Sequence, residues 1–412
     1  MAPSPRPGST RGRRPRISLD AREGFRENPR GIGLYVRHLM RELGALKPKA
    51  EILLYHERER PRDLPEIPEG QRGLRFDLPG YRLMSWERLG LPWRLMRDRV
   101  DLHHGTYNSL PPRPPLGHGT KLVMTLHDVI VTWLEADLED AFVRYARKRT
   151  GAFVRRADAI VTVSEFSKRE IVQRFGAAPD KVRVLYNGVD PYYLEALEAE
   201  AGEGAAREGE ALRAEICGGR PYLFAIGAGL DRKNTKALVP LLGELEKAGE
   251  LGERLLVISG LGEEKREELR SLARERGVEE RLRFPGYVPK ATLRALFEGA
   301  ELFVYPSLVE GWGIPILEAM ARGTQVACSQ GSGMEEAAGG LAALFDPEDP
   351  DDMLRVVRDC LRKAEALRER NRAKGLARAR GFTWEAHVRG LLGLYGELLG
   401  EDLLAPGDGC PA

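Results

Sequence analysis

Short apolar runs alternate with longer polar segments along most of the chain, and this alternation predicts an α/β fold. Apolar runs of about four to eight residues, bounded by turn residues, are typical of buried strands. Between them lie helical patterns such as residues 36–43, which place apolar side chains on one face. The expected strands are residues 17–20, 51–55, 100–104, 121–128, 159–163, 182–190, 221–227, 255–262, 281–288, 300–306 and 325–329. Strands alternating with helices predict parallel sheets covered by helices on both faces.

The alternation stops once, near the middle, and this interruption predicts two domains. Residues 193–219 are rich in alanine, glutamate and glycine, which is typical of a helix plus a linker. We therefore predict one domain at 17–192, a second at 193–383, and a last amphipathic helix at 384–399. The leader at 1–16, with five arginines among proline, glycine and serine, is expected to be disordered, as is the tail at 400–412. A polar, proline-rich connection is expected over residues 61–79.

Composition limits the possible classes of protein. The chain has 412 residues, 42% of them hydrophobic, and its 64 basic and 62 acidic residues nearly balance, so it is neither a nucleic-acid polyelectrolyte nor an acidic tail protein. Its four scattered cysteines form no metal-binding or disulfide pattern, and no apolar run reaches the ~18 residues of a membrane span. A cytoplasmic protein is the simplest expectation.

Contact with a membrane surface remains open. Residues 81–93 mix apolar and aromatic side chains with arginines, a pattern that suits a lipid headgroup or a lipid-linked acceptor. An ordinary helix packed on the sheet explains the same pattern, and we favour that interpretation. The arginines of the leader are compatible with nucleic acid or anionic lipid, but a solubilising segment is the simpler explanation.

The sequence Glu-Gly-Trp-Gly-Ile-Pro-Ile-Leu-Glu-Ala-Met at residues 310–320 predicts an anion-binding helix start. A buried strand precedes it, Gly311 and Gly313 allow a tight turn, and Pro315 suits the first turn of a helix. Unpaired N–H groups and the helix dipole then face the turn. Glu310 and Glu318 frame this turn and offer acceptors to the hydroxyl groups of a nucleotide sugar. Alternatively, Glu310 supports the turn and Glu318 is a helix-surface charge.

Two further candidates lie where predicted strands end. His127 and Asp128 follow the strand at 121–128, and ligands gather beyond the carboxyl ends of parallel strands. The histidine suits a sugar hydroxyl, although a main-chain carbonyl is an equally ordinary partner for it. Arg232 and Lys233 follow the first strand of the second half, where adjacent cations suit a diphosphate leaving group. Surface cations are common, so this pair alone is a weak signal.

Together, the two-glutamate motif, the Thr-x-His-Asp segment ending at Asp128 and the Arg-Lys-Asn segment at 232–234 resemble the retaining glycosyltransferases of family 4. The resemblance covers most of the chain from Gly31 onward. It implies the GT-B architecture of two facing Rossmann-like domains, with a terminal helix that crosses back to the first domain. Gln325 departs from the family, which usually has proline there, while Glu336 matches a glutamate common in the family.

The resemblance also implies roles for individual residues. His127 contacts the donor sugar, Glu310 holds its hydroxyl groups, Glu318 holds the ribose, and Arg232 and Lys233 hold the diphosphate. It further implies that Gly31, Gly33 and Tyr35 lie near the donor phosphate and the acceptor, and that Tyr287 and Val288 lie at the nucleobase. The other substrate- or donor-binding positions that it implies are Asp128, Gly311, Trp312, Gly313 and Ile314.

The function predicted from the resemblance is retaining transfer of a hexose from a nucleotide diphosphate sugar to an acceptor hydroxyl. GDP-mannose and UDP-linked hexoses are the leading donors, and the acceptor is a glycan, a lipid-linked saccharide or a small metabolite. The two cations replace a metal, and no Asp-x-Asp motif lies near the cleft, so we predict no metal cofactor. Alternatives are a GT-B phosphorylase, which needs pyridoxal phosphate, a nucleotide-sugar epimerase, or a non-catalytic protein that binds nucleotide sugar or nucleic acid. We expect no nucleic-acid partner.

Overall fold

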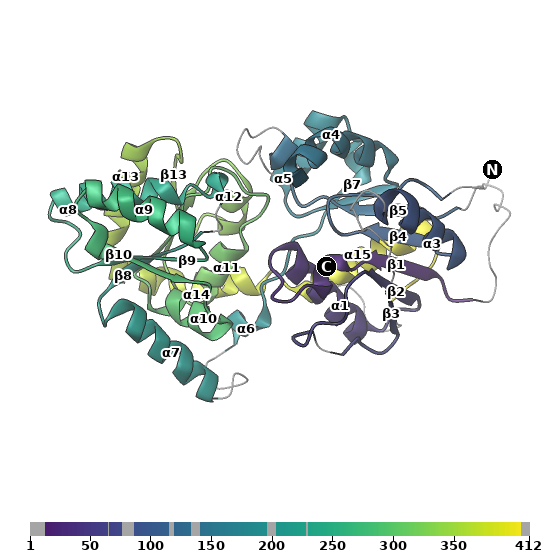
Figure 1. Cartoon of the computed structure of the whole chain (residues 1–412), viewed down its shortest axis with the longest axis horizontal. Helices are drawn as coiled ribbons and strands as arrows, with labels where there is room; N and C mark the ends of the chain where they lie inside the picture. Colours follow the sequence, from purple (N-terminus) through teal and green to yellow (C-terminus); the bar gives the residue numbers. More distant parts are fainter. Residues whose placement is uncertain are drawn as a thin grey trace.

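The computed structural model of the chain describes residues 13–64, 66–75, 86–114, 119–132, 141–195, 203–227 and 230–404. Within these ranges the strands form two parallel sheets, one of seven strands and one of six. Figure 1 shows the sheets in two lobes lying side by side, which we call the N-terminal and the C-terminal lobe. The predicted parallel α/β fold with two facing Rossmann-like units is confirmed.

The first sheet has the strand order β3-β2-β1-β4-β5-β6-β7. Its strands are β1 (Arg16–Asp20), β2 (Glu51–His56), β3 (Gln71–Arg75), β4 (Leu102–Gly105), β5 (Lys121–Thr125), β6 (Ala159–Thr162) and β7 (Val182–Val184). Because neighbouring strands run parallel, their carboxyl ends lie along one edge of the sheet.

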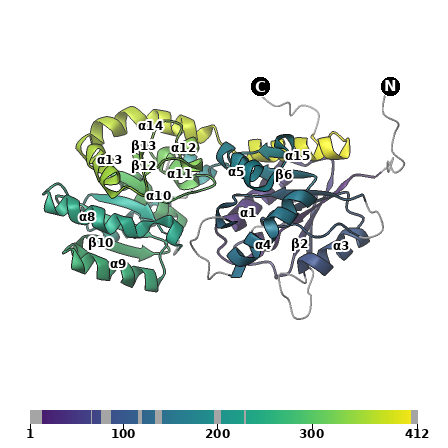
Figure 2. The same ribbon diagram turned by 90° about the horizontal axis from the view of Figure 1, so that it is seen from above.

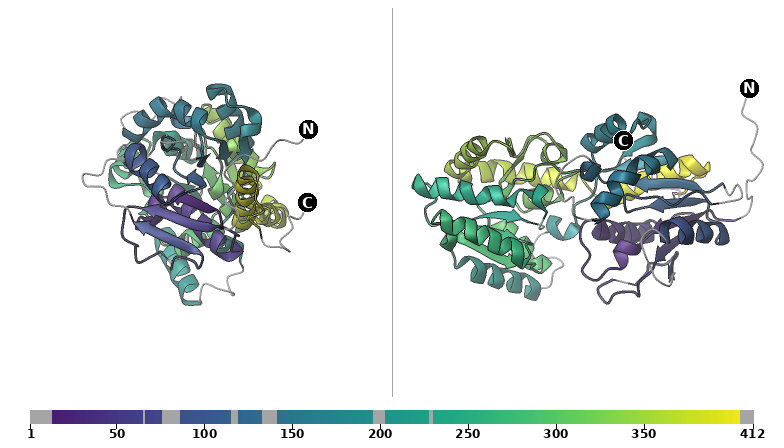
Figure 3. Two further views of the ribbon diagram at one scale, coloured as in Figure 1. Left: turned by 90° about the vertical axis from the view of Figure 1, so that its right-hand side faces the viewer. Right: turned by 45° about the horizontal axis from the view of Figure 1, so that its top comes forward.

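Helices cover both faces of this sheet (Figure 3). One face packs against α1 (Ile32–Leu46) and α15 (Trp384–Leu399), whose apolar side chains share a core with Ile17 and Leu19. The other face packs against α3 (Leu91–Arg97), α4 (Ala141–Arg156) and α5 (Glu165–Phe175). Helix α15 is the last helix of the described chain and follows the C-terminal lobe in sequence, yet it lies in the N-terminal lobe in Figure 2. The chain therefore passes between the lobes twice.

The second sheet has the order β10-β9-β8-β11-β12-β13. Its strands are β8 (Tyr222–Ile226), β9 (Leu255–Ser259), β10 (Leu282–Gly286), β11 (Leu302–Tyr305), β12 (Val326–Ser329) and β13 (Ala343–Phe345). Alternate residues of β8 point to opposite faces: Tyr222 and Phe224 join one core, and Leu223 and Ala225 join the other.

These two cores are closed by two sets of helices. The first set is α7 (Glu203–Cys217), α10 (Lys290–Gly299), α11 (Ile314–Ala321), α12 (Gly333–Ala338) and α14 (Ala364–Arg380). The second set is α8 (Leu238–Lys247), α9 (Glu263–Glu275) and α13 (Pro350–Arg362). Short α6 (Pro191–Leu194) connects the lobes (Figure 1). The single helical turns are η1 (Arg22–Phe25), the π-helical η2 (Trp86–Gly90), η3 (Ile130–Thr132), η4 (Pro179–Lys181), η5 (Asp231–Lys233), η6 (Thr235–Ala237) and η7 (Glu279–Arg281).

The structure corrects the predicted connection over residues 61–79, because β3 lies inside it. This strand, Gln-Arg-Gly-Leu-Arg, pairs with β2 along its whole length at the edge of the sheet. Leu74 is the one large apolar residue among its five, so no hydrophobic periodicity distinguishes this edge strand from a polar loop.

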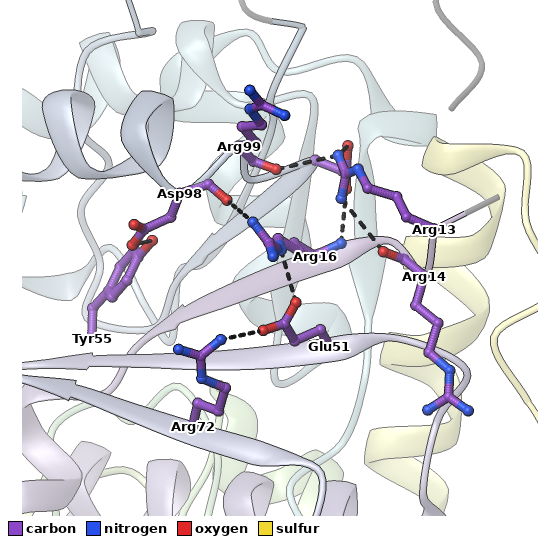
Figure 4. Close-up of polar contacts among 9 residues, drawn as sticks. Arg13, Arg14, Arg16, Glu51, Tyr55, Arg72, Asp98 and Arg99 are labelled. Atoms are coloured by element: carbon purple, nitrogen blue, oxygen red, sulfur yellow. Dashed lines mark hydrogen bonds and ion pairs between the residues drawn. The ribbon is translucent and has the colours of Figure 1, made fainter. Parts of the chain in front are cut away.

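The structure describes the last four residues of the predicted leader, residues 13–16. Residues 1–12 lie outside the described part of the chain, but Arg16 is the first residue of β1 and its Nε donates to Glu51 Oε2 at 2.7 Å. Arg13 pairs with Asp101 at 2.8 Å, and Arg72 reaches the second oxygen of Glu51 at 2.7 Å (Figure 4). Arg13 and Arg16, which the sequence places in the leader, are therefore held by ion pairs to the N-terminal lobe.

The first residues of the predicted tail, 400–404, are also described and make contacts with the N-terminal lobe. Gly400 ends α15 with a φ of +71°, and the chain then turns back so that Leu403 is buried and its carbonyl accepts from Lys49 N at 2.9 Å. Residues 405–412 lie outside the described part.

Candidate active site where the two lobes meet

The loop that follows β5 in the N-terminal lobe contacts the loop that follows β11 in the C-terminal lobe. A Cβ atom placed on Gly311 would lie 2.6 Å from the carbonyl oxygen of His127 and 2.9 Å from Cβ of Asp128. Real side chains do not tolerate such distances, so only glycine fits at position 311. The carboxyl ends of parallel strands are where α/β sheets bind ligands. This contact between the lobes therefore marks the candidate site.

Three charged side chains form the centre of the site. Arg232 Nη1 lies 3.0 Å from Glu310 Oε2, and Lys233 Nζ lies 2.6 Å from Glu310 Oε1. Burial alone would raise the pKa of Glu310, but Lys233 and Arg232 outweigh it and lower this pKa to about 2. The carboxylate is therefore ionised at neutral pH, and it holds two cations side by side.

The surroundings of this triad fix it further. Lys233 Nζ also donates to the hydroxyl of Tyr305, the last residue of β11, at 2.8 Å. Burial raises the pKa of Asp128, while Arg232 opposes that shift, so the carboxyl group of Asp128 belongs to the same electrostatic cluster. Asp128 also accepts from the backbone N–H of Ile130 at 3.0 Å. Two cations from the C-terminal lobe thus face an acidic group of the N-terminal lobe.

His127 is held in one orientation. Its backbone N–H donates to Asn108 Oδ1 at 2.8 Å, and its Nε2 lies 3.2 Å from the carbonyl oxygen of Thr106. Since a carbonyl only accepts, Nε2 carries the proton and Nδ1 remains an acceptor. Burial lowers the pKa of His127 to about 4, so the ring is neutral at pH 7. A neutral imidazole suits hydrogen bonding with a sugar hydroxyl.

Tyr35 lies behind His127, inside the core. Its ring meets the His127 ring edge-on at a centroid distance of 4.7 Å. The Tyr35 hydroxyl lies 2.9 Å from Thr125 Oγ1 and 3.2 Å from Nε2 of His387 on α15. Its burial favours support of the His127 ring over direct contact with a ligand.

The helix start at α11 has the predicted form. Gly313 is the N-cap residue and makes no side-chain cap, Ile314 opens the helix, and Pro315 follows at its second position. The first N–H groups of α11 therefore receive no side-chain cap from Gly313. Trp312 is buried, with its ring 4.9 Å from Tyr186 and 5.2 Å from Phe382, so it anchors the turn in the core.

Glu318 lies one turn inside α11, close to the connection between the lobes. Burial raises its pKa to about 8, with Asp190 adding to this shift and Lys290 opposing it. Lys290 Nζ pairs with Asp190 Oδ2 at 2.5 Å. Glu318 is therefore largely protonated at neutral pH and does not belong to the charged triad of Glu310.

Four further predicted residues lie at the start of α1 in the N-terminal lobe, Gly31 and Gly33, and after β10 in the C-terminal lobe, Tyr287 and Val288. Gly31 has a φ of +46° and is the N-cap of α1, while Gly33 packs so closely that an added Cβ would lie 2.7 Å from the carbonyl oxygen of Glu23. Tyr287 follows β10, is 55% exposed, and stacks under the guanidinium of Arg30 at 3.2 Å from its ring centroid. Val288 is partly buried against the core. The Arg30 loop and Tyr287 thus meet across the two lobes.

Sequence analysis missed two partners of the site and left one glutamate without a role. Tyr305 reads as an apolar strand residue, and Asn108 lies in a loop without a motif. Glu336 of α12 binds the first N–H groups of α5, in the other lobe. Because the partners of Glu336 belong to the other lobe, its local sequence gives no sign of this contact.

The described residues contain no group of three or more His, Cys, Asp or Glu side chains placed to hold a metal ion. Among these residues, no helix combines the length and the apolar character needed to cross a bilayer. Cys217, Cys328 and Cys360 are buried free thiols, and Cys410 lies outside the described part.

Two parallel α/β lobes with a charged site at their meeting point define the class of protein: an enzyme of GT-B architecture. Residues 213–378 match the family described as glycosyl transferases group 1, and residues 29–193 match glycosyltransferase family 4. O-antigen chain mannosyltransferase B from Escherichia coli is 30% identical over 371 residues, which cover 86% of this chain and 93% of that protein.

Solved structures show the same architecture. Sucrose-phosphate synthase from Thermosynechococcus elongatus superposes with a TM-score of 0.72 at 19% identity, covering 94% of this chain and 100% of that one. HepE from Anabaena, solved in complex with UDP-glucose, superposes with a TM-score of 0.68 at 17% identity, covering 93% and 99% of the two chains. The chain belongs to glycosyltransferase family 4 and is a hexosyltransferase. Members of this family use nucleotide-sugar donors.

Proposed function

We propose that the protein transfers a mannosyl- or glucosyl-type hexose, with retention of the anomeric configuration, from a nucleotide diphosphate sugar to a hydroxyl group of a saccharide or lipid-linked acceptor. The observation that carries this proposal is the ion-paired triad of Arg232, Lys233 and Glu310 beside the start of α11, with His127 across the lobe boundary. Two cations at a helix start suit a diphosphate.

The reaction follows from these positions. As the bond between the sugar C1 and the diphosphate oxygen breaks, negative charge grows on the diphosphate, and Arg232 and Lys233 stabilise it. Glu310 orients both cations and accepts from sugar hydroxyls, while His127 holds the sugar from the other lobe. The acceptor oxygen forms the new bond to C1 on the same face, and its proton passes to the departing phosphate. No protein base and no metal ion are needed in this scheme.

The comparisons favour two donors. The Escherichia coli relative is named as a mannosyltransferase, and the Anabaena structure contains UDP-glucose. We therefore place GDP-mannose and UDP-glucose first, with polysaccharide assembly as the setting.

Thermal denaturation with a panel of nucleoside diphosphates and their sugars tests the donor site. A ligand at about 100 times its Kd stabilises the folded state by about 2.7 kcal/mol. We expect one nucleotide family to raise Tm in the presence of EDTA, and Glu318→Ala and Arg232→Ala to abolish this rise. A shift with nucleic acid instead, or visible absorbance from a lysine-bound pyridoxal phosphate, would support the alternative functions.

Glu318 makes nucleotide binding depend on pH. A ribose hydroxyl donates best to an ionised carboxylate, and Glu318 ionises as pH rises through its pKa of about 8. We expect the Kd for the nucleoside diphosphate to fall up to about tenfold between pH 7 and pH 9. Without ligand the sign is opposite: the raised pKa makes the free energy of unfolding decrease as pH rises from about 4.5 to about 8.

Calorimetric titration at both pH values measures this effect. The Glu318→Gln variant and a 2′,3′-dideoxy nucleotide serve as controls, and each should remove the pH dependence. An unchanged dependence in either control would show that Glu318 does not bind the ribose.

A basic and apolar surface on the N-terminal lobe supports peripheral contact with the cytoplasmic face of a membrane. Helix α4 carries the exposed Arg144, Arg147, Lys148 and Arg155 and no acidic residue. Tyr145 of α4 donates to Glu87 of η2 at 2.8 Å, which places η2 and α3 beside it. There Leu89 is 72% and Trp93 is 47% exposed. Cations beside exposed apolar side chains suit an anionic lipid surface.

Vesicle sedimentation tests this surface. We expect binding to phosphatidylglycerol vesicles that Leu89→Asp and Lys148→Glu each weaken severalfold, since a basic side chain near such a surface contributes about 1 kcal/mol. Lys247→Glu, on the C-terminal lobe, should bind like the parent protein. Equal binding to phosphatidylcholine, or equal loss in all three variants, would contradict the assignment.

A further inference from the structure

The start of helix α5, in the N-terminal lobe, lies directly against the loop at residues 306–313, which joins β11 to α11 in the C-terminal lobe (Figure 2). Ser164 is the N-cap of α5 and accepts from the N–H of Ser167 at 2.9 Å. The same hydroxyl donates to the carbonyl oxygen of Gly311 at 2.6 Å and is fully buried. One side chain thus caps its own helix and binds the residue next to Glu310.

Ser167 adds a second link at the same point. Its hydroxyl lies 3.3 Å from the carbonyl oxygen of Gly311 and 3.3 Å from that of His127. A hydroxyl carries one proton, so it donates to one of these carbonyls at a time. It bridges the two loops that bring Glu310 and His127 together.

Glu336 completes the contact from the opposite side. Its carboxylate, on α12 of the C-terminal lobe, accepts from the backbone N–H of Glu165 at 3.0 Å and of Phe166 at 3.2 Å. The positive end of the α5 dipole favours an anion at this position. Tyr186, in the connection between the lobes, donates to the same carboxylate at 2.8 Å. A glutamate of one lobe therefore caps a helix of the other.

Neither Gly311 nor Gly333 can carry a side chain at this contact without moving a neighbouring backbone. A Cβ on Gly333, at the start of α12, would lie 2.2 Å from the carbonyl oxygen of Gly311, and a Cβ on Gly311 would strike the backbone of His127. Arg378 donates to the carbonyl oxygen of Glu336 at 2.6 Å and to that of Ala337 at 3.1 Å, which fixes α12 to α14. The loop at Gly311 is thus held between α5 and α12.

We propose that Ser164, Ser167 and Glu336 are positioning residues that set Glu310 and its two cations against His127 by joining the lobes. This inference rests on the proposed function of that site. The position of Gly311 relative to β5 sets the separation between the groups that bind the diphosphate and the group that faces the sugar. A misplacement of about 1 Å at reacting groups can cost about 100-fold in rate.

The test uses Ser164→Ala combined with Glu336→Ala, in the full-length chain. Fluorescence energy transfer between dyes on the two lobes, recorded without substrate, should show a larger separation than in the parent protein. With a nucleotide sugar, kcat should fall about tenfold or more. The Kd of the nucleoside diphosphate should change less than about twofold, because Arg232, Lys233 and Glu318, which are assigned to the diphosphate and the ribose, all lie in the C-terminal lobe. Ser164→Thr, which keeps the hydroxyl, should retain both properties.

Two controls separate positioning from stability. Asp349→Ala removes the N-cap of α13, which packs on the sheet face opposite α11 and α12, and Glu335→Ala removes the carboxylate next to Glu336, which binds Gly331 N within its own lobe. Both should keep the energy transfer and kcat of the parent protein. Unchanged energy transfer in the double variant, or an equal loss of kcat in Asp349→Ala, would overturn the proposal. If the parent protein transfers no sugar, the proposed function fails, and energy transfer alone still decides on the contact.

Discussion

The Lys233→Met variant is expected to lose about 10²- to 10³-fold in kcat with a nucleotide-sugar donor, the usual cost of removing one group that stabilises developing charge. Lys233 Nζ lies 2.6 Å from Glu310 and 2.8 Å from the Tyr305 hydroxyl, so its position is fixed before the donor arrives. Methionine keeps the aliphatic part of the side chain and removes only the charge. Arg232→Met should have an effect of similar size, because it holds the other oxygen of Glu310.

Lys236→Met is the matched control for Lys233→Met. Lys236 belongs to the same segment, but it pairs with Glu268 and its side chain is 64% exposed. Its loss should leave kcat within about twofold of the parent value. Steady-state kinetics on the three variants measure these changes in kcat. A decrease of less than about fivefold in kcat for Lys233→Met would exclude this lysine from the proposed mechanism.

Gly311→Ala is expected to lower kcat/KM for the donor about 100-fold, since even one added methyl group must separate the two lobes. That methyl would lie 2.6 Å from a backbone oxygen of His127 and 2.9 Å from Cβ of Asp128. Neither atom is the free end of a flexible side chain, so the loops themselves must move. The distance between Glu310 and His127 then increases, and misplaced reacting groups cost rate steeply.

Gly393→Ala is the control for this substitution. Gly393 lies in α15, where an added Cβ would meet no heavy atom within 4 Å. Alanine favours the helix, so Tm should rise or stay constant while the kinetics remain unchanged. Should Gly311→Ala keep the kcat/KM of the parent protein, contact between the two loops would be irrelevant to turnover.

The local sequence is enough to predict the central strands of both sheets. Tyr222 to Ile226 and Leu302 to Tyr305 are short apolar runs between turns, and their parallel pairing follows from the helices that separate them. The sequence does not predict the edge strand β3, because Leu74 is its one large apolar residue and no hydrophobic periodicity marks the segment. The ordered parts of the leader and tail depend on partners distant in sequence, such as Glu51 for Arg16 and Lys49 for Leu403.

The site likewise contains residues that local motifs predict and contacts that they do not. Local motifs predict Arg232, Lys233 and Glu310 as site residues, and in the structure both cations lie within ion-pair distance of Glu310. Tyr35 was chosen with them, but its hydroxyl is bound within the core to Thr125 and His387, the latter contributed by α15. Local sequence predicts Ser164 only as a helix cap, because its second partner, Gly311, belongs to the other lobe. Contacts between lobes arise only after both have folded.

The most direct test of the proposed retaining transfer is to follow the sugar itself. Many transferases pass a sugar slowly to water, so GDP-mannose and UDP-glucose can be incubated with the protein and EDTA while proton magnetic resonance records the first anomer released. We predict that one donor yields nucleoside diphosphate and the α-hexose, which has the configuration of the donor, and that Lys233→Met abolishes this release. Release of the β-hexose first, or of no sugar from either donor, would contradict the account.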